Sequence, residues 1–269
     1  MIINFNPNAV RTKTRGHTSG FLDVDAQFII SSLVSKGTSV HLPHKAAING
    51  FVKSGKANGW WDKCVGIYGL YGDTADSHAV NWKTPGCYDI AWSGTVNHDN
   101  APNAGISSGG GYGDTGIIPS EHFSTSSHVS ALVEGNTVAQ ETLIGCYNNN
   151  AGRHEIGRYN SEIQSWASTW TAQRVWIVNP GAPKWLLANR EDNLSHELYS
   201  DGIEGGSIER QAQNPTVSLY VLASNKDGIA EKFASNLRCS FFSVGFGLTA
   251  AQRTQMNNAV FSLRAAIRQ

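Results

Sequence analysis

A glycine-rich segment at residues 107–120, "SSGGGYGDTGIIPS", holds the polar side chains best suited to contact a ligand. Its three consecutive glycines permit backbone angles that other residues avoid, so Tyr112 and Asp114 could both face a ligand. The Asp114 carboxylate could bind Ca²⁺ or accept a hydrogen bond from a sugar hydroxyl. An Asp in such a loop can equally cap its own turn. Tyr112 and Asp114 are therefore candidate ligand-binding residues, with a purely structural role as the alternative.

A second polar group, "NHDN" at residues 97–100, follows an apolar run that predicts a strand. Asn97, His98 and Asp99 could supply oxygen and imidazole ligands from this position. No second cluster at a metal-binding spacing accompanies them, so a surface turn is the alternative. The sequence predicts no cofactor, and Ca²⁺ is the one metal that we keep open.

Tryptophan is frequent, with eight residues in the chain, and an exposed indole could stack on a sugar ring. Trp166 and Trp170 lie in "QSWASTW", a less apolar context than that of Trp176 or Trp185. They are therefore the better candidates for sugar stacking. Packing in a core or an interface is the alternative for both.

The charge balance argues against a polyanionic partner, because Lys plus Arg and Asp plus Glu each number 21. No apolar run reaches the ~18 residues needed to cross a bilayer. The first residues lack the apolar core of a signal peptide. We therefore expect synthesis in a cytoplasm, no nucleic-acid partner and no membrane insertion. Residues 1–20, with Arg11, Lys13 and Arg15 and no acidic residue before Asp23, are expected to form an extended arm.

The pattern over most of the chain is typical of strands. From residue 65 onward, short apolar or alternating runs are separated by Gly, Pro and Asn clusters, which favours an all-β sandwich. Ten runs are expected as strands, among them "HVSALVEG", "TVSLYVLA" and "CSFFSVG". Asp201-Gly202 and Asp227-Gly228 predict tight turns. The four cysteines are far apart and lie beside apolar residues, so we expect buried free thiols.

Three segments have helical periodicity. "DAQFIISSLVSKG" (25–37) would place Phe28, Ile29 and Leu33 on one face. A second helix is expected to follow Pro43 and to stop near Gly59. The third lies almost at the C-terminus, where Thr249 and Gln252 form a capping box. An apolar stripe follows this box at spacings of four, three and four, and is expected to pack on the sandwich: Met256, Val260, Leu263 and Ile267.

Several of these motifs occur in order and resemble a known family. The segments Ala47–Lys63, Gly111–Ser120 and Gly245–Gln252 match "A-I-x-x-x-V-x-x-x-K-x-x-G-x-W-x-K", "G-Y-x-D-T-x-x-x-P-S" and "G-x-G-L-T-x-x-[EQ]". In these motifs the chain resembles the concanavalin A-like, laminin-G-type jelly-roll modules of bacteriophage structural proteins. The resemblance covers roughly residues 23–269. It implies a two-sheet antiparallel jelly roll and a virion component, such as a tail fibre, spike or head appendage.

We therefore expect one jelly-roll domain at residues 21–269, displayed on a virion and attached to other virion proteins through residues 1–20. A homo-oligomer, or docking on a symmetric platform, is expected as well. Loops at one end of the sandwich would adhere to host-surface glycans. A capsid decoration or cement protein without a ligand is one alternative, and a glycan depolymerase or lyase on the same fold is another.

A catalytic role is disfavoured by the carboxylates. Glycosidases on related jelly rolls carry E-x-D-x-E or E-x-D-x-x-E on one strand, and this pattern is missing. Glu191 and Asp192 would point to opposite faces of a strand, and Glu197 is too distant to complete the motif. No nucleophile elbow, zinc-protease motif or P-loop is present either. We expect a protein that is not an enzyme.

Overall fold

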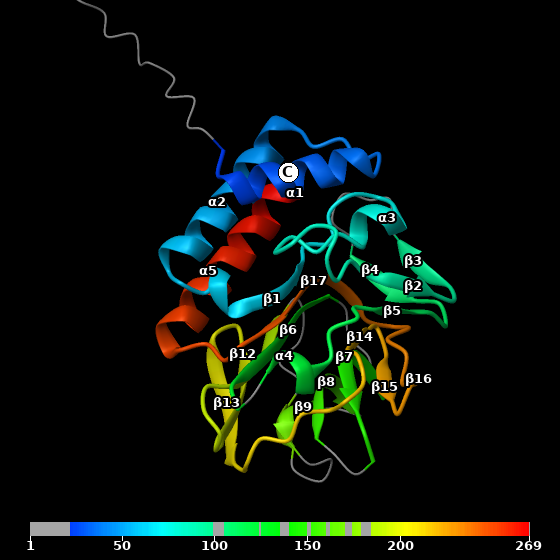
Figure 1. Cartoon of the computed structure of the whole chain (residues 1–269), viewed down its shortest axis with the longest axis vertical. Helices are drawn as coiled ribbons and strands as arrows, with labels where there is room; N and C mark the ends of the chain where they lie inside the picture. The colour runs from blue at the N-terminus through cyan, green and yellow to red at the C-terminus, as the bar shows by residue number, and fades with distance from the viewer. Residues whose placement is uncertain are drawn as a thin grey trace, which may run out of the picture.

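The computed structural model describes residues 22–98, 105–123, 125–134, 140–149, 152–159, 162–169, 174–178 and 184–268. Within these residues two β-sheets pack face to face, and three long helices cover one of them (Figure 1). The expected two-sheet antiparallel sandwich, with helices near the N-terminus and a C-terminal helix, is confirmed. The division of the chain into an arm at 1–20 and one domain at 21–269 stays a prediction.

Sheet A is antiparallel and has eight strands within the described residues. Seven of them lie in the order β13 (Ile203–Glu209), β12 (Ser195–Ser200), β11 (Lys184–Arg190), β6 (Ser127–Glu134), β17 (Arg238–Gly245), β4 (Ile106–Ser108) and β3 (Val96–His98). The eighth strand, β1 (Cys64–Tyr68), pairs with β17.

Sheet B has nine strands within the described residues. Its main order is β10 (Val175–Val178), β9 (Glu162–Thr169), β8 (Arg153–Tyr159), β7 (Glu141–Tyr147), β14 (Tyr220–Val221), β5 (Tyr112–Asp114) and β2 (Ala91–Ser93). A hairpin of β15 (Ser224–Lys226) and β16 (Ile229–Glu231) joins β7, and the β15–β7 pair is parallel.

The alternation of side chains along β6 explains the layers. Val129, Ala131 and Val133 point into the core between the sheets, while Leu132 points the opposite way, under the helices. Both faces of β6 are buried, and its polar residues Ser127, His128 and Ser130 are buried together with its apolar ones. Sheet A is thus the middle layer of three, and sheet B has one face turned away from the rest of the molecule.

The helical layer consists of α1 (Val24–Ser35), α2 (Leu42–Ala57) and α5 (Ala250–Ile267). Three short helical turns lie elsewhere: η1 (Trp61–Lys63), α3 (Ala75–His78) and α4 (Pro119–His122). The strand residues buried under the helical layer all belong to sheet A: Cys64, Ile67, Leu132, Trp185, Leu187, Tyr199 and Phe241. Figure 1 shows the three long helices gathered on one side of the sandwich.

The C-terminal helix forms as the sequence predicts. Thr249 Oγ1 accepts from the Gln252 backbone N–H, and the Gln252 side chain accepts from the Thr249 backbone N–H. Met256, Val260, Leu263 and Ile267 are buried. The stripe packs on the face of sheet A, as expected, and also on α2.

Several finer expectations are wrong. Phe28 is 61% exposed, because the buried face of α1 is formed by Ala26, Ile29, Ile30 and Leu33 instead. Cys87 is exposed, whereas Cys64, Cys146 and Cys239 are buried and free as expected.

Several strands and one long run also differ from the prediction. The run at 216–223 forms only the short strand β14, because the backbone turns at Leu222 with φ +65°. Strands β9 and β13 were not predicted, nor were the short strands β4, β5, β15 and β16, of which β5 lies in the glycine-rich segment expected as a loop. The two predicted turns are confirmed, with positive φ at Asp201, Gly202, Asp227 and Gly228.

Candidate functional site

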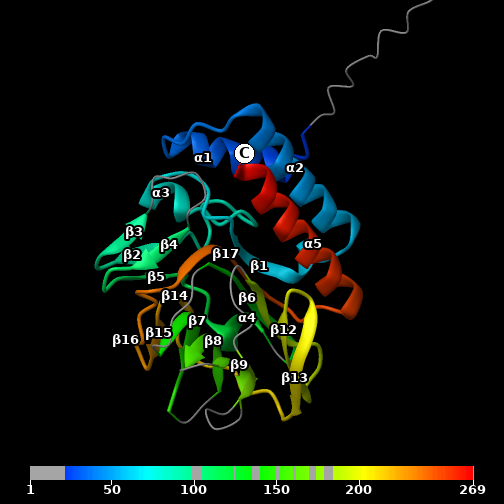
Figure 2. The same cartoon turned by 180° about the vertical axis from the view of Figure 1, so that it is seen from behind.

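The outer face of sheet B, which points away from sheet A, carries a row of polar and aromatic side chains. Residues paired across neighbouring strands point to the same face of a sheet. Tyr220 pairs with both Asp114 and Gly145, Gly145 with Glu155, and Glu155 with Trp166. Their sequence neighbours Val221, Ile144, Cys146 and Ile156 lie in the core between the sheets, so the row itself faces outward. Figure 2 shows β5, β14, β7, β8 and β9 side by side in this order.

A buried ion pair stands at the centre of this row. Glu155 is 0% exposed, and its carboxylate accepts hydrogen bonds from Arg153 Nε at 2.9 Å and Arg153 Nη2 at 2.7 Å. Thr142 Oγ1 donates at 2.8 Å, Tyr159 Oη at 2.7 Å and Ser224 Oγ at 2.7 Å. Gly145 makes room for this carboxylate, because a Cβ at that position would lie 2.5 Å from Glu155 Cγ.

The five hydrogen bonds keep the Glu155 carboxyl ionised. Burial by itself would raise the pKa of the carboxyl, but the Arg153 charge and hydrogen bonds lower the pKa to about 2. Burial by itself would lower the pKa of the Arg153 guanidinium, but the nearby Glu155 carboxylate outweighs burial and raises this pKa. The two side chains therefore remain charged at neutral pH and hold each other in one geometry.

Three aromatic rings surround the Arg153 guanidinium. Its central carbon lies 3.6 Å from the ring centroid of Trp166, 4.8 Å from that of Tyr147 and 5.7 Å from that of Tyr159. A guanidinium over an aromatic face is held by cation–π attraction. The Trp166 indole is 2% exposed in this arrangement.

The hairpin of β15 and β16 adds charged groups beside these rings. Tyr147 Oη donates to Glu231 Oε1 at 2.5 Å, and Lys232 Nζ lies 3.0 Å from the same oxygen. Burial, followed by the hydrogen bond to Glu231, raises the pKa of Tyr147. We call the set of Tyr147, Arg153, Glu155, Tyr159, Trp166, Glu231 and Lys232 the sheet B cluster.

A second aromatic group lies along the same face. The Tyr112 and Tyr220 rings are stacked with centroids 4.3 Å apart, and Phe233 lies 6.5 Å from Tyr112. Asp114 Oδ1 accepts from the Gly116 backbone N–H at 2.8 Å, so this carboxylate caps its own turn. Tyr112, Asp114 and Trp166, which lie far apart in the sequence, are thus on one face, but Asp114 and Trp166 are four strands apart.

The exposure of the tryptophans differs from the sequence-based ranking. Trp166 is covered by Arg153, whereas Trp176 is 51% exposed. Trp176 pairs with Gln164, and Val175 and Ile177 on either side of it belong to the core, so its indole lies on the outer face of sheet B. The prediction that Trp166 is the more exposed of the two is therefore wrong, because its polar sequence neighbourhood did not reflect its burial, while a ligand role of Trp166 stays a prediction. Trp185 is buried under the helices.

The "NHDN" segment lies elsewhere. Asn97 and His98 belong to strand β3 of sheet A, so they do not follow the strand as predicted. His98 Nδ1 lies 3.0 Å from His78 Nδ1, and the His98 ring packs against Trp92. Asp99 and Trp170 lie outside the described residues, as do Arg11, Lys13 and Arg15 of the expected arm.

Metal-binding clusters and membrane-spanning helices are absent from the described part of the chain. No group of three or more His, Cys, Asp or Glu side chains there could hold a metal ion. In the same residues, no helix is long and apolar enough to cross a membrane.

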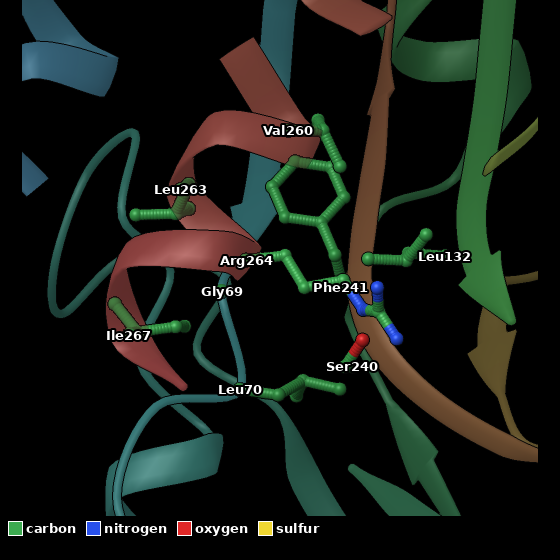
Figure 3. Close-up of a pocket in the computed structure, with 9 residues that line it drawn as sticks. All are labelled: Gly69, Leu70, Leu132, Ser240, Phe241, Val260, Leu263, Arg264 and Ile267. Carbon is green, nitrogen blue, oxygen red and sulfur yellow. The ribbon is translucent and has the colours of Figure 1, made fainter. Parts of the chain in front are cut away.

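Two recesses lie in the helical layer, away from the sheet B cluster. A cavity of about 10 Å³ lies between α5 and sheet A, where Leu70, Phe241 and Leu263 line it (Figure 3). That volume is about the size of one water molecule. A larger groove of about 340 Å³ separates α2 from α5, and its lining carries no charged side chain. Neither recess adjoins the sheet B cluster.

Most residues of the sheet B cluster were not predicted from the sequence as site residues. In "RHEIGRY", Arg153, Glu155 and Tyr159 occupy alternate positions and so share one face of a strand. That alternation was the available signal, but nothing local indicated that Trp166 and Lys232 would meet this face.

Comparisons with known proteins identify the fold. No family model matches the sequence, and no curated protein matches it either. The binding domain of botulinum neurotoxin DC in complex with SialylT matches with a TM-score of 0.55 and 14% identity, over 74% of this chain and 52% of that one. The same binding domain in complex with rat synaptotagmin II matches with a TM-score of 0.53 and 13% identity, over 74% and 52%.

A type C botulinum neurotoxin structure, described by its interaction with two ganglioside molecules, matches with a TM-score of 0.52 and 13% identity, over 74% and 52%. The chain therefore spans about half the length of the solved binding domains it matches. At this identity the likeness shows a shared fold: a β-sandwich of the kind found in these binding domains.

Proposed function

We propose that this protein is a glycan-binding module of a bacteriophage virion, carried on a tail fibre, spike or head appendage. The observation that carries the glycan-binding part is the outer face of sheet B. Helices cover sheet A, whereas sheet B bears a half-exposed tryptophan, a tyrosine stack and an organised charged cluster.

The chemistry of this face suits a saccharide. Aromatic faces pack against the C–H faces of sugar rings, and fixed charged groups supply hydrogen bonds to hydroxyls. The hydrogen bonds around Glu155 hold Arg153 and Tyr159 in place before any ligand arrives, and such preorganisation lowers the entropic cost of binding. The neurotoxin binding domains share the fold, and one of them is described by its interaction with gangliosides.

The virion part of the proposal rests on the three ordered motifs that resemble phage structural proteins. In this proposal the residues around Arg11, Lys13 and Arg15 attach the module to other virion proteins, and several copies assemble together. A cryo-EM map of the intact particle tests this part. Projection from the particle surface supports an appendage, whereas a position flush between capsomers indicates a cement protein.

The buried carboxyl is unsuited to act as the general acid of a glycoside hydrolase. A general acid must be protonated at the working pH, so its pKa is normally raised. Glu155, with a pKa of about 2, is ionised and fully engaged with donors. Release of reducing ends from host polysaccharide by the purified protein would contradict the non-enzymatic assignment.

A glycan array with two matched variants tests the binding part. Trp176→Ala removes a 51% exposed aromatic side chain from sheet B, and Phe28→Ala removes a 61% exposed one from α1. We expect the first variant to weaken glycan binding about tenfold, equivalent to about 1.4 kcal/mol, and the second to leave it unchanged. Equal binding by both variants would exclude Trp176 from the binding surface, and a loss confined to Phe28→Ala would contradict the proposed binding face.

A further inference from the structure

An unusual backbone geometry places a lysine at the edge of the sheet B cluster. Lys232 has φ +56°, a backbone conformation that residues other than Gly, Asn and Asp rarely adopt. Its Nζ lies 5.2 Å from the ring centroid of Tyr147 and 5.3 Å from that of Tyr159. The ammonium is thus held near two ring faces, while its side chain remains 23% exposed. Such outliers often occur where a side chain must be aimed at a functional site.

A second lysine approaches the same ring. Lys226 Nζ, at the end of β15, lies 5.8 Å from the centroid of Tyr147. Arg153 lies 4.8 Å from that centroid. Three cationic groups therefore surround Tyr147, although like charges at close range disfavour one another.

The carboxylates of the cluster balance these cations only in part. Glu155 is occupied by Arg153, and Glu231 by Tyr147 and Lys232. Counted with Asp227, three cations and three carboxylates lie at this edge, but Lys226 forms no ion pair with a carboxylate of the described residues. The nearby Asp227 carboxylate accepts a hydrogen bond from Asn148 Nδ2 at 3.0 Å.

We infer that the edge formed by Lys226, Lys232 and Tyr159 binds the carboxylate of an acidic saccharide. This inference rests on the proposed glycan-binding function and specifies its ligand class. The carboxylate of a uronic acid unit would lie between the two ammonium groups. Neighbouring sugar units would extend toward Phe233 and the Tyr112–Tyr220 stack, which lie on the same face.

Oligogalacturonate and its carboxyl-reduced, neutral counterpart are the probes, because they differ only in the carboxylate. Binding of both to the purified full chain is measured by calorimetry, together with the variants Lys226→Gln, Lys232→Gln and the double variant. Lys36→Gln, an exposed lysine just after α1, makes the same charge change on the helical side. Thermal unfolding of every variant checks that it is folded.

We expect the wild-type protein to bind the acidic probe about tenfold more tightly than the neutral one, as charge-assisted hydrogen bonds would give. The double variant should bind both probes with the weaker affinity, and Lys36→Gln should behave as wild type. The preference should also decline with added salt.

Two results would overturn the inference, and they are distinguishable. Equal wild-type affinity for the two probes, or a preference that survives in the folded double variant, removes the acidic-ligand assignment but leaves glycan binding intact. Absence of binding to both probes, combined with a negative glycan array, removes the proposed function and the inference with it.

Discussion

The outer faces of the two sheets use the same alternation of side chains for different purposes. On sheet A, Leu132, Trp185 and Phe241 point outward and are buried by helices α2 and α5. On sheet B, the outward positions carry Glu155, Trp166 and their partners, which cover one another. Leu132, Trp185 and Phe241 are buried by apolar packing, and Glu155 and Trp166 by a polar network, although Trp176 on the same face as Trp166 remains 51% exposed.

This difference shows what each face contributes. Apolar burial adds roughly 25 cal/mol per Å² to stability and needs no exact geometry. A buried ion pair adds little net stability, because desolvation offsets the attraction between the charges. Its retention on sheet B is better explained by the fixed positions that it imposes on Arg153, Tyr147 and Tyr159.

The largest expected effect tests the helical face. Phe241 is 2% exposed and its ring packs 5.8 Å from that of Phe51. Phe241→Ala should lower the free energy of unfolding by about 3–5 kcal/mol, because it leaves a cavity under the helices. Urea unfolding measures this value. The exposed Phe28→Ala should change it by no more than about 0.5 kcal/mol, and a similar loss in both variants would refute the assigned core.

The next effect tests the sheet B cluster. Glu155→Gln leaves the Arg153 charge buried without a carboxylate and should cost about 3 kcal/mol of unfolding free energy. The double variant Arg153→Met/Glu155→Leu should recover most of that loss, because an apolar pair needs no desolvated charge. The proposed glycan binding should be lost in the single variant and should not return in the double variant. Retained binding there would mean that the ion pair has no organising role.

The smallest effect, taken for one histidine and one pH unit, separates the interior from the cluster. Burial lowers the pKa of His128 and His196 to about 4 and that of His154 to about 3. Unfolded histidine has a pKa of about 6.5, so between pH 6.5 and 4 the unfolded state binds protons that the folded state does not. Stability should therefore fall as pH drops through this window, by up to about 1.4 kcal/mol per pH unit for each histidine.

The Glu155 contribution has a lower window, since its pKa is lowered from about 4.5 to about 2. It should be present above pH 4.5 and be lost as pH falls toward 2. Urea unfolding at a series of pH values measures both windows. His196→Gln, which keeps a donor for the Ser165 carbonyl, should reduce the slope between pH 6.5 and 4. A flat stability profile over that range would contradict the buried neutral histidines.

Local features could be predicted well from the sequence. The capping box at Thr249 and Gln252, the apolar stripe that follows it and the tight turns at Asp201 and Asp227 depend on residues within a few positions of each other. The fold class follows from the same kind of evidence, because short alternating runs separated by turn residues favour a sandwich.

The burial of individual side chains and their neighbours in the fold could not be predicted in the same way. The sequence context ranked Trp166 above Trp176 as an exposed residue, but strand pairing puts Arg153 over Trp166 and leaves Trp176 at the edge of sheet B. The exposure of Phe28 also depends on which face of α1 meets α2. Predicting the exposure of these side chains requires knowing how strands and helices that are distant in the chain pair and pack.

The sequence by itself determined the periodic elements, their caps and turns, and the two-sheet class, since short-range steric and hydrogen-bonding preferences specify these. The tertiary structure alone decided that strands β5, β14, β7, β8 and β9 align Asp114, Tyr220, Glu155 and Trp166 in one row. It also decided that Lys232 reaches Tyr147 and Tyr159. The physical reason is that a shift of one residue in any pairing would turn a whole strand's side chains to the opposite face.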